Sequence, residues 1–464
     1  MNQTKPPSSL THAVVMGGSL GGLLTARVLS AHYQRVTILE RDPIPDQPEA
    51  RKGQPHTRHL HGLLATGLDV LTHYFPDLPQ ALADGGAIMP DFANGMNWYT
   101  GSGYRQRFQM GTKATLMSRP FLESLVRQRV TALPNVKLLD NCAVSQLMTT
   151  PDKQRVLGVE VEMRHEGNQL VTVLADLVVD CTGRGSRTTQ WLMEMGYVAP
   201  PVSEVKVDVV YTTRLFKRDP ADPRGQQWTL VTPEAPRETR FGAIFPIEGD
   251  RWIVSLGGWH GDHPPADEAG FMAFARSLPA SDVFDVIKQA EPISDIIQHK
   301  FPFSLRRHYE KLHRFPQGYL VLGDAISSFN PTYGQGMTSA AIQVTELDKL
   351  LAKGTVAQDL AQRFFKRAAK VVDSPWQLAV GEDFRFPQTS GPKPAGTDFI
   401  NYYVAKVHRA TLSDPEVCLA LLKVMNLMAP PPSLFHPRIV WRVLRARPSA
   451  QPTPVLTTQP AAGN

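Results

Sequence analysis

A glycine-rich stretch near the start of the chain constrains the fold more than any other feature. The segment "AVVMGGSLGGLLTARVL" (residues 13–29) carries Gly17 and Gly22 at the first and third positions of the pattern Gly-x-Gly-x-x-Gly. The apolar run before Gly17 predicts a strand, and the apolar spacing after Gly22 predicts a helix. A strand, a tight glycine turn and a helix in this order are typical of the Rossmann-type fold, in which the turn faces a pyrophosphate.

Ser19 stands where the pattern has its middle glycine. That position must let the backbone approach the pyrophosphate at the helix N-terminus. Serine is small and its hydroxyl can face a phosphate, while Gly18 and Gly21 add room. Glu40 ends the next expected strand, "RVTILE", where a carboxylate accepts hydrogen bonds from an adenosine ribose. An acid there favours FAD or NAD over NADP, although a purely architectural turn stays open.

A second motif distinguishes FAD from NAD. In "GYLVLGDAISSFNPTYGQGM", Asp324 follows an apolar strand, and a loop with Pro331, Gly334 and Gly336 leads into a predicted helix. An acid at this strand end can bond the hydroxyls of a ribityl chain, and the helix N-terminus offers N–H groups to an anion. Nicotinamide cofactors have no ribityl chain, so the two motifs together favour FAD.

The hydrophobic pattern changes between these motifs. We expect a helix from about His59 or His61, strands or a hairpin over 89–117, a serine-capped helix beginning at "SRPF", antiparallel strands from about 200, and a helix around 268–291. The predicted fold class is α/β with an α+β insertion: a Rossmann-like FAD-binding domain interleaved with an antiparallel-sheet substrate domain and followed by a C-terminal helical extension. The predicted boundaries are 10–88, 114–200 and 312–352 for the FAD-binding domain, 89–113 and 201–311 for the substrate domain, 353–448 for the helical extension, and 449–464 for a disordered tail.

Composition narrows the function classes. The 464 residues carry a formal charge of +6 with the basic residues scattered, which gives no nucleic-acid-binding pattern. Three widely spaced cysteines indicate neither a disulfide framework nor a metal site. Because a secretion signal and an 18-residue apolar run are both lacking, we expect a cytoplasmic protein. The apolar, basic-punctuated run "VCLALLKVMNLMAPPPSLFHPRIVWRVLRAR" favours a packed extension and leaves peripheral contact with a membrane surface open.

Taken with "RKGQPHTRHLHGLL", "SRPFLESLV" and "ADLVVDCTGRGSR", these motifs resemble FAD-dependent monooxygenases of the p-hydroxybenzoate hydroxylase fold over residues 13–345. They are similar in particular to bacterial polyether-pathway epoxidases, relatives of squalene epoxidase. The resemblance implies an epoxidase-like oxidoreductase of secondary metabolism. It would insert one oxygen atom from O2, through a flavin hydroperoxide, into an apolar, alkene-bearing or aromatic substrate. Epoxidation and hydroxylation both stay open.

The resemblance also assigns individual positions. It implies no separate catalytic side chain, since the chemistry is centred on the flavin. The FAD-binding positions that it implies are Gly17, Gly18, Ser19 and Gly22 at the pyrophosphate, Glu40 and Arg41 near the adenosine ribose, Arg58 and Arg119 near the phosphates, Val144 at the adenine, Asp324 at the ribityl chain, Pro331 and Gly334 in the flavin loop, and the backbone N–H groups of Gly336 and Met337 at the flavin pyrimidine edge. The expected substrate-lining residues, for which ordinary sheet core is an equal alternative, are Tyr211, Phe245, Trp252, Leu256 and Trp259.

Two departures from related enzymes bear on the reaction. Many NADPH-using hydroxylases of this fold carry an Asp-Gly pair where this chain has Asp180 and Gly183 two positions too far apart. NADPH or NADH therefore stays open as a direct donor or as a donor through a separate flavin reductase. The Trp-x-Trp-x-Ile-Pro signature of flavin halogenases is absent. The main alternative is an FAD-dependent reductase or dehydrogenase of the geranylgeranyl-reductase type, and a non-catalytic flavin-binding module is a third.

Overall fold

The computed structural model describes residues 10–101, 103–222, 224, 226–354 and 357–446, so the tail expected to be disordered lies outside the described residues. Within that part, the nucleotide-type sheet has five parallel strands in the order β15-β9-β1-β2-β5. All of its strands except the edge strand β5 are almost fully buried and mainly apolar, as expected for a parallel sheet covered on both faces. They are β1 (His12–Met16), β2 (Arg35–Leu39), β5 (Val136–Leu139), β9 (Leu177–Asp180) and β15 (Tyr319–Val321).

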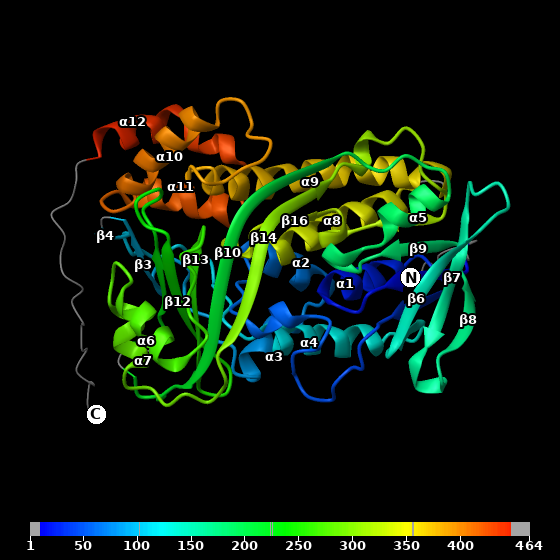
Figure 1. Ribbon diagram of the computed structural model, residues 1–464, viewed down its shortest axis with the longest axis horizontal. Coiled ribbons are helices and arrows are strands. Elements are labelled where there is room, and N and C mark those ends of the chain that lie inside the picture. The colour runs from blue at the N-terminus through cyan, green and yellow to red at the C-terminus, as the bar shows by residue number, and fades with distance from the viewer. Residues whose placement is uncertain (1–9, 102, 223, 225, 355–356, 447–464) are drawn as a thin grey trace, which may run out of the picture.

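Helices cover this parallel sheet (Figure 1). Helix α4 begins as the sequence predicts, because the Ser118 hydroxyl accepts a hydrogen bond from the backbone N–H of Phe121 at 3.3 Å. The helix expected from His59 or His61 begins only at Ala65, since a separate 3-10 turn, η1 (Pro55–Arg58), precedes it. The helices around the sheet are α1 (Leu20–Leu29), α2 (Ala65–Tyr74), α3 (Leu78–Asp84), α4 (Arg119–Thr131), α5 (Thr188–Glu194) and α8 (Gly336–Ala352).

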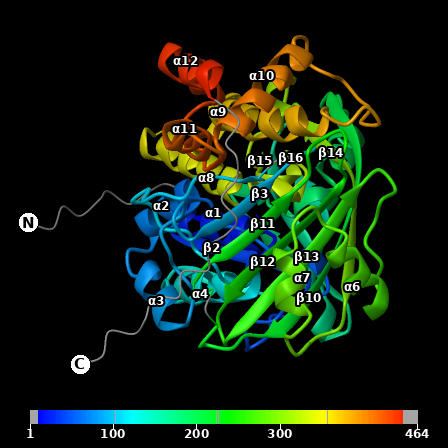
Figure 2. The ribbon, with the colours of Figure 1, turned by 90° about the vertical axis from the view of Figure 1, so that its left-hand side faces the viewer.

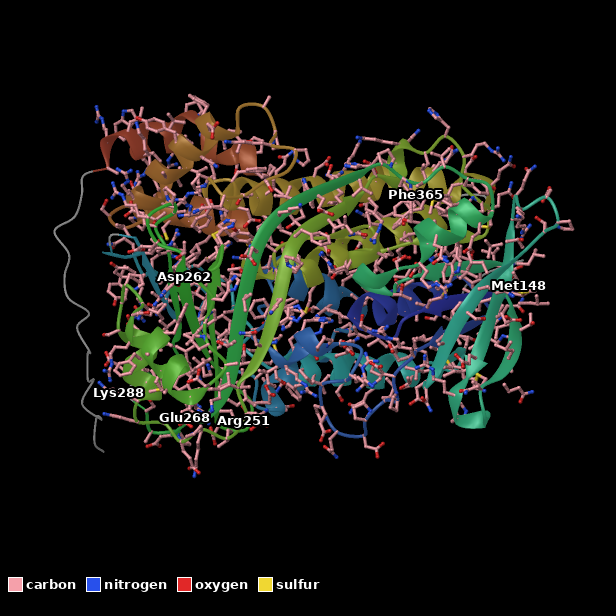
Figure 3. The ribbon with its side chains drawn as sticks, in the orientation of Figure 1. Met148, Arg251, Asp262, Glu268, Lys288 and Phe365 are labelled. Carbon is pink, nitrogen blue, oxygen red and sulfur yellow. The ribbon has the colours of Figure 1, made fainter. Side chains whose placement is uncertain are left out.

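A three-stranded antiparallel sheet closes one end of the molecule. Figure 3 places Met148 of this sheet at that end, and Asp262 and Glu268 toward the other. The first strand runs on from the edge of the parallel sheet, because the backbone N–H of Cys142 donates to the carbonyl oxygen of Glu40 at 2.9 Å. The strands are β6 (Cys142–Thr149), β7 (Val156–Met163) and β8 (Gln169–Leu174).

The middle of the chain forms an eight-stranded sheet that is mostly antiparallel, in the order β16-β14-β10-β13-β12-β11-β3-β4. The short strand β16 comes from the second motif, which joins this sheet to the part of the chain that holds the parallel sheet. The helix expected over 268–291 is instead two helices, α6 (Glu268–Arg276) and α7 (Asp282–Ile287), with Pro279 between them because proline cannot donate a helical hydrogen bond. The strands are β3 (Met96–Thr100), β4 (Gly103–Tyr104), β10 (Val202–Lys217), β11 (Trp228–Thr232), β12 (Arg240–Ile247), β13 (Arg251–Trp259), β14 (Ile297–Arg307) and β16 (Ser327–Ser328).

The C-terminal part is helical, as predicted. The long helix α9 (Ala357–Asp383) lies along α8. Three further helices stack over one end of the eight-stranded sheet (Figures 1 and 2). These are α10 (Thr397–Ala410), α11 (Pro415–Met425) and α12 (Pro437–Arg445), with the 3-10 turn η7 (Pro431–Phe435) between the last two. Among the residues described, no helix is both long and apolar enough to cross a membrane. The predicted α/β fold class with an interleaved antiparallel sheet is confirmed.

Candidate active site

The first motif forms a tight turn whose shape only glycine permits. Gly17 has φ +100°, and a Cβ on it would lie 2.7 Å from the carbonyl oxygen of Cys181. A Cβ on Gly22 would lie 1.9 Å from the carbonyl oxygen of Gly17. Ser19 precedes α1 in an extended conformation, and its hydroxyl makes no capping bond to the helix. The half-buried Ser19 therefore presents a polar side chain and the first helical N–H groups to a large cavity of about 1240 Å³.

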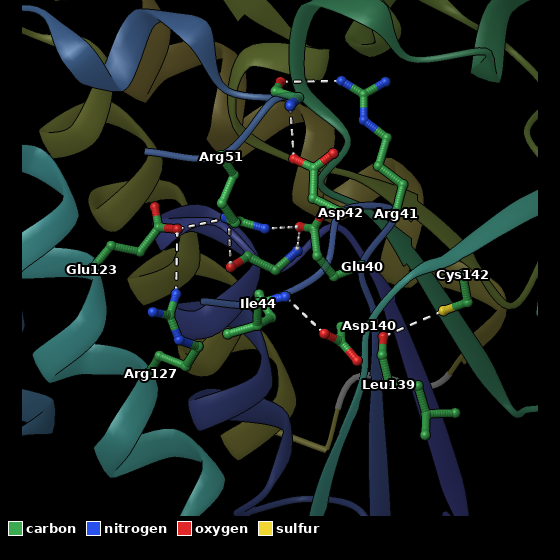
Figure 4. Close-up of polar contacts among 12 residues, drawn as sticks. Glu40, Arg41, Asp42, Ile44, Arg51, Glu123, Arg127, Leu139, Asp140 and Cys142 are labelled. Carbon is green, nitrogen blue, oxygen red and sulfur yellow. Dashed lines mark hydrogen bonds and ion pairs between the residues drawn. The ribbon is translucent and has the colours of Figure 1, made fainter. Parts of the chain in front are cut away.

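Glu40 lies beside this turn in a buried network of charges (Figure 4). Its carboxylate accepts a hydrogen bond from the backbone N–H of Gly18 at 2.7 Å and another from the N–H of Asp42 at 3.0 Å. Arg51 contacts Glu40 at 2.8 Å and Glu123 at 2.7 Å. A carboxylate has about four lone-pair positions, so Glu40 keeps room for one more donor, as a ribose hydroxyl requires.

Of the basic residues expected near the cofactor, the structure places two at the cavity and one away from it. Arg119, the first residue of α4, lines the cavity, and its Nε has no hydrogen-bond partner in the described part of the chain. Arg41 also lines the cavity and donates to the carbonyl oxygen of Gly53 at 3.0 Å. Arg58 is exposed and is not among the cavity-lining residues, so the structure does not bring it to the expected phosphate region. Arg51, which the sequence analysis missed, is buried at this end together with Arg119.

Val144 follows Cys142 and Ala143 on β6, and all three line the same cavity beyond Glu40. The expected adenine contact therefore lies on the ribose side of the glycine turn. Gly18 and Gly22 do not line the cavity themselves. Gly18 holds Glu40, and Gly22 lets α1 pack under the turn.

Asp324 lies in a 3-10 turn, η5 (Gly323–Ala325), directly after β15. A Cβ on Gly336 would lie 3.8 Å from its Oδ1, so the carboxylate faces the start of α8. Its side chain is exposed only into the cavity, and the surrounding protein raises the pKa of this carboxyl, an effect that Arg119 and Arg184 oppose. A hydrogen-bonding acid at this place fits the ribityl position that the sequence indicates.

The loop between Asp324 and α8 is fixed by polar contacts. Asn330 accepts a hydrogen bond from the N–H of Thr332, and Gly334 takes up φ +67° before the helix begins at Gly336. Asp383, at the end of α9, accepts from the side-chain amide of Asn330 and from the hydroxyl of Tyr333, both at 2.9 Å. Pro331, Gly334, Gly336 and Met337 all line the cavity. The first N–H groups of α8 thus point toward an anion at this position.

Asp180 contributes no side chain to the cavity. It is fully buried and accepts hydrogen bonds from the hydroxyls of Thr182 at 2.6 Å and of Ser186 and Thr188 at 2.5 Å. Asp180 is therefore committed to holding the turn after β9, while Gly183, which has φ +78°, lines the cavity instead.

The eight-stranded sheet supplies the other wall, and strand alternation decides which side chains reach it. Tyr211, Phe245 and Trp259 line the cavity. Trp252 and Leu256 point to the opposite face, where they pack against Phe271 of α6 in a separate core. The expectation that Trp252 and Leu256 line a substrate site is therefore corrected: successive side chains of a strand face opposite sides, and these two lie on the covered side.

The histidines of the "PHTRHLH" stretch take different positions. His59 is buried, contacts the Thr213 hydroxyl at 2.8 Å and packs edge-on against Tyr211. Burial lowers the pKa of His59 to about 3, so this ring is neutral. His61 lines the cavity. Across the described ranges, no group of three or more histidine, cysteine or acidic side chains is placed to hold a metal ion.

A third wall, absent from the sequence analysis, comes from the C-terminal helices. Residues of α9, α10, α11 and η7, with Arg385 just after α9, close the cavity over the sheet; they include Trp376, Glu382, His408, Leu422 and Phe435. Arg105, directly after β4, also lines this end. The sequence analysis expected a helical extension here, but no local signal indicated which of its side chains would face the cavity.

The chain has the fold of flavoproteins of the p-hydroxybenzoate hydroxylase type. It is similar to a flavoprotein/dehydrogenase from Cytophaga hutchinsonii (14% identity, TM-score 0.65, 90% of this chain and 92% of that one). It is also similar to p-nitrophenol 4-monooxygenase PnpA from Pseudomonas putida DLL-E4 (17% identity, TM-score 0.61, 90% and 99%) and to the flavin-dependent brominase Bmp2 (15%, 0.62, 90% and 94%). The fold predicted from the resemblance is confirmed.

No protein-family model matches the chain. Over 410 residues it is 34% identical to Protein Rv3254 of Mycobacterium tuberculosis (strain ATCC 25618 / H37Rv), and the match covers 84% of each chain. The chain belongs to the same family as Protein Rv3254.

Proposed function

We propose that the protein is an FAD-dependent monooxygenase that inserts one oxygen atom from O2 into an apolar, alkene-bearing or aromatic small molecule. One observation carries this proposal. A single cavity runs from the glycine turn and Glu40, past Asp324 and Gly336, to the aromatic face of the eight-stranded sheet. A dinucleotide and an organic substrate can therefore occupy one enclosed space.

The residues present fit FAD. Ser19 and the N-terminus of α1 would receive the pyrophosphate, Glu40 the adenosine ribose, and Val144 the adenine. Asp324 would bind the ribityl chain, and the N–H groups of Gly336 and Met337 would face the negatively polarised edge of the ring system. When bound, FAD supplies the redox chemistry and the activation of O2.

The chain's own residues orient the substrate and exclude water. Phe92, Trp98, Trp228 and Phe245 form one apolar cluster on the cavity side of the sheet, and Leu422 of α11 closes it. Such a wall suits an apolar substrate body, since burial removes apolar surface from water. No histidine or cysteine is assigned a covalent role.

A separate observation bears on how electrons reach the site. Asp180 is fully bonded inside the protein and not followed by glycine, so it is not available to a nicotinamide nucleotide. We propose delivery of electrons from NADPH or NADH, with a separate flavin reductase as the donor if direct reduction fails. Anaerobic mixing of the purified, FAD-loaded protein with NADPH tests this point, because bleaching of the visible flavin band shows direct reduction.

Products formed from candidate alkenes and arenes under labelled ¹⁸O2 test the main proposal. One labelled oxygen atom in the product supports a monooxygenase. Loss of a double bond without label supports the reductase alternative, and the absence of a flavin band after FAD is supplied overturns the flavoprotein assignment. Halogenated products are not expected, although a brominase shares the fold, because the halogenase signature is missing from the sequence.

A further inference from the structure

A line of polar side chains, three of them charged, lies along the cavity between the sheet and the C-terminal helices. The Nη2 of Arg105 donates to the Nδ1 of His408 at 2.8 Å. The Nε2 of His408 lies 3.3 Å from Glu382, which Arg385 contacts on its other oxygen at 2.8 Å. All four side chains line the cavity. Since Nδ1 of His408 accepts a hydrogen bond, Nε2 carries the hydrogen and donates to Glu382.

Within this line, Glu382 is already paired with Arg385, whereas no acidic side chain among the described residues forms an ion pair with Arg105. Arg105 is only 4% exposed, yet its Nε and Nη1 have no hydrogen-bond partner among the described residues. Its guanidinium lies 3.8 Å from the centre of the Trp98 ring, which holds it in place but accepts no conventional hydrogen bond. Burying an uncompensated charge is costly, so a native site of this kind is expected to have an anionic partner.

The protonation states keep this end of the cavity positive. Burial lowers the pKa of Arg105 to about 10, which leaves the guanidinium charged at neutral pH. Burial also lowers the pKa of His408, although Glu382 opposes that shift, so the imidazole is neutral. Arg385 and His408 hold the pKa of Glu382 below its usual range. Cys418, the other titratable group beside Arg105, has its pKa raised to about 11 by burial and stays a neutral thiol.

From this arrangement we infer that Arg105 binds an anionic oxygen, a carboxylate or a phenolate, carried by the apolar substrate. This inference rests on the proposed function and specifies its substrate class: an aromatic or alkenyl acid rather than a neutral hydrocarbon. Planar guanidinium groups suit such oxygens because two parallel N–H groups can meet them.

The neighbouring side chains support an acceptor-bearing substrate. The indole N–H of Trp228 is buried, and Trp228 lines the same cavity and its N–H has no partner in the described part of the chain. An indole N–H can only donate a hydrogen bond. Trp228 packs edge-on against Phe92 and Phe245, so this donor is set into an aromatic wall. A substrate with an apolar body and oxygen acceptors would complement both features.

Isothermal titration of the purified protein, in excess FAD and without reductant, tests the inference with matched acids and amides. The probes are 2-naphthoate against 2-naphthamide, and cinnamate against cinnamamide, which differ mainly in charge. We expect both acids to bind at least roughly tenfold more tightly than their amides, because a charge-assisted hydrogen bond is worth about 1.5–3 kcal/mol.

Three variants test whether Arg105 is the cause of the preference for acids over amides. Arg105→Gln should abolish the preference for the acid, whereas Arg105→Lys should keep part of it because the charge remains. Arg107→Gln is the matched control, since Arg107 lies two residues away on the same segment, is exposed and does not line the cavity; it should keep the full preference. Circular dichroism checks the fold of each variant. If Arg105→Gln does not fold, the inference is tested instead by comparing acid and amide binding in the unaltered protein and in Arg105→Lys.

Equal affinity for acid and amide in the unaltered protein would overturn the inference. So would a preference that survives in folded Arg105→Gln, or the absence of saturable binding by both acids. Because the titration needs no turnover, its failure is distinct from failure of the proposed function, which shows as missing label from ¹⁸O2.

Discussion

The hydroxyl of Tyr333 donates a 2.9 Å hydrogen bond to Asp383, so the last residue of α9 holds the loop that leads into α8. Asn330 donates to the same carboxylate oxygen at 2.9 Å. A residue 50 positions further along the chain thus sets the path of the segment that faces the expected flavin edge. This contact ties the end of α9 to the loop that leads into α8.

Asp383 should also make stability depend on pH. Burial raises its pKa to about 7 in the folded protein, against about 4 in an unfolded chain. Between these values the folded protein holds a proton that the unfolded chain has released. This contribution to stability is therefore fully present below about pH 4 and is lost as the pH rises through about 7. Urea unfolding should show that the free energy of unfolding declines across this pH range. Because Asp383→Asn cannot ionise, the part of the decline that is due to Asp383 should be absent in that variant. An identical slope in the variant would contradict the assignment.

Gly22→Ala should destroy the glycine turn. The added methyl group would lie 1.9 Å from the carbonyl oxygen of Gly17, too close for any contact, so the strand and α1 would have to separate. We expect loss of FAD binding and a large fall in Tm. Gly21→Ala is the control for stability, because its nearest neighbour is 3.8 Å away, and its Tm should stay unchanged or rise slightly. A stable Gly22→Ala protein would show that the turn does not require glycine there.

Arg51→Met should destabilise the protein and weaken FAD binding, because it leaves Glu40 and Glu123 as buried carboxylates with a partner removed. Breaking a buried ion pair on one side costs about 3–5 kcal/mol, which urea unfolding would detect. Arg58→Met is the matched comparison, since Arg58 is exposed and away from the cavity. Its stability and FAD affinity should be nearly unaltered. The reverse order of effects would restore Arg58 as the cofactor residue.

The two faces of the eight-stranded sheet should respond differently to truncation. Leu256→Ala opens a space in the core against α6 and should cost about 2–5 kcal/mol of stability while leaving ligand affinity unchanged. Phe245→Ala removes a cavity wall and should weaken binding of 2-naphthoate. Unfolding curves and titrations of both variants measure this separation. A ligand effect confined to Leu256→Ala would place the substrate on the other face.

The sequence by itself determined the backbone geometry of the parallel-sheet part of this protein. Gly17, Gly22, Glu40 and the Asp324 segment act through local geometry: a turn that only glycine can make, an acid at a strand end, and a helix N-terminus. Such features depend on neighbours within about twenty residues, and the structure gives them the expected backbone positions.

Only the tertiary structure decided the rest of the site. The alternating sequence pattern predicted that β13 is a strand, but not which of its faces another element covers. Helix α6 covers the face that carries Trp252 and Leu256. The contact between Arg105 and His408 joins residues about 300 positions apart, and Arg51 pairs with Glu40 because the loop between them folds back. Packing between distant parts of the chain determines these contacts, so the spacing of residues along the sequence does not predict them.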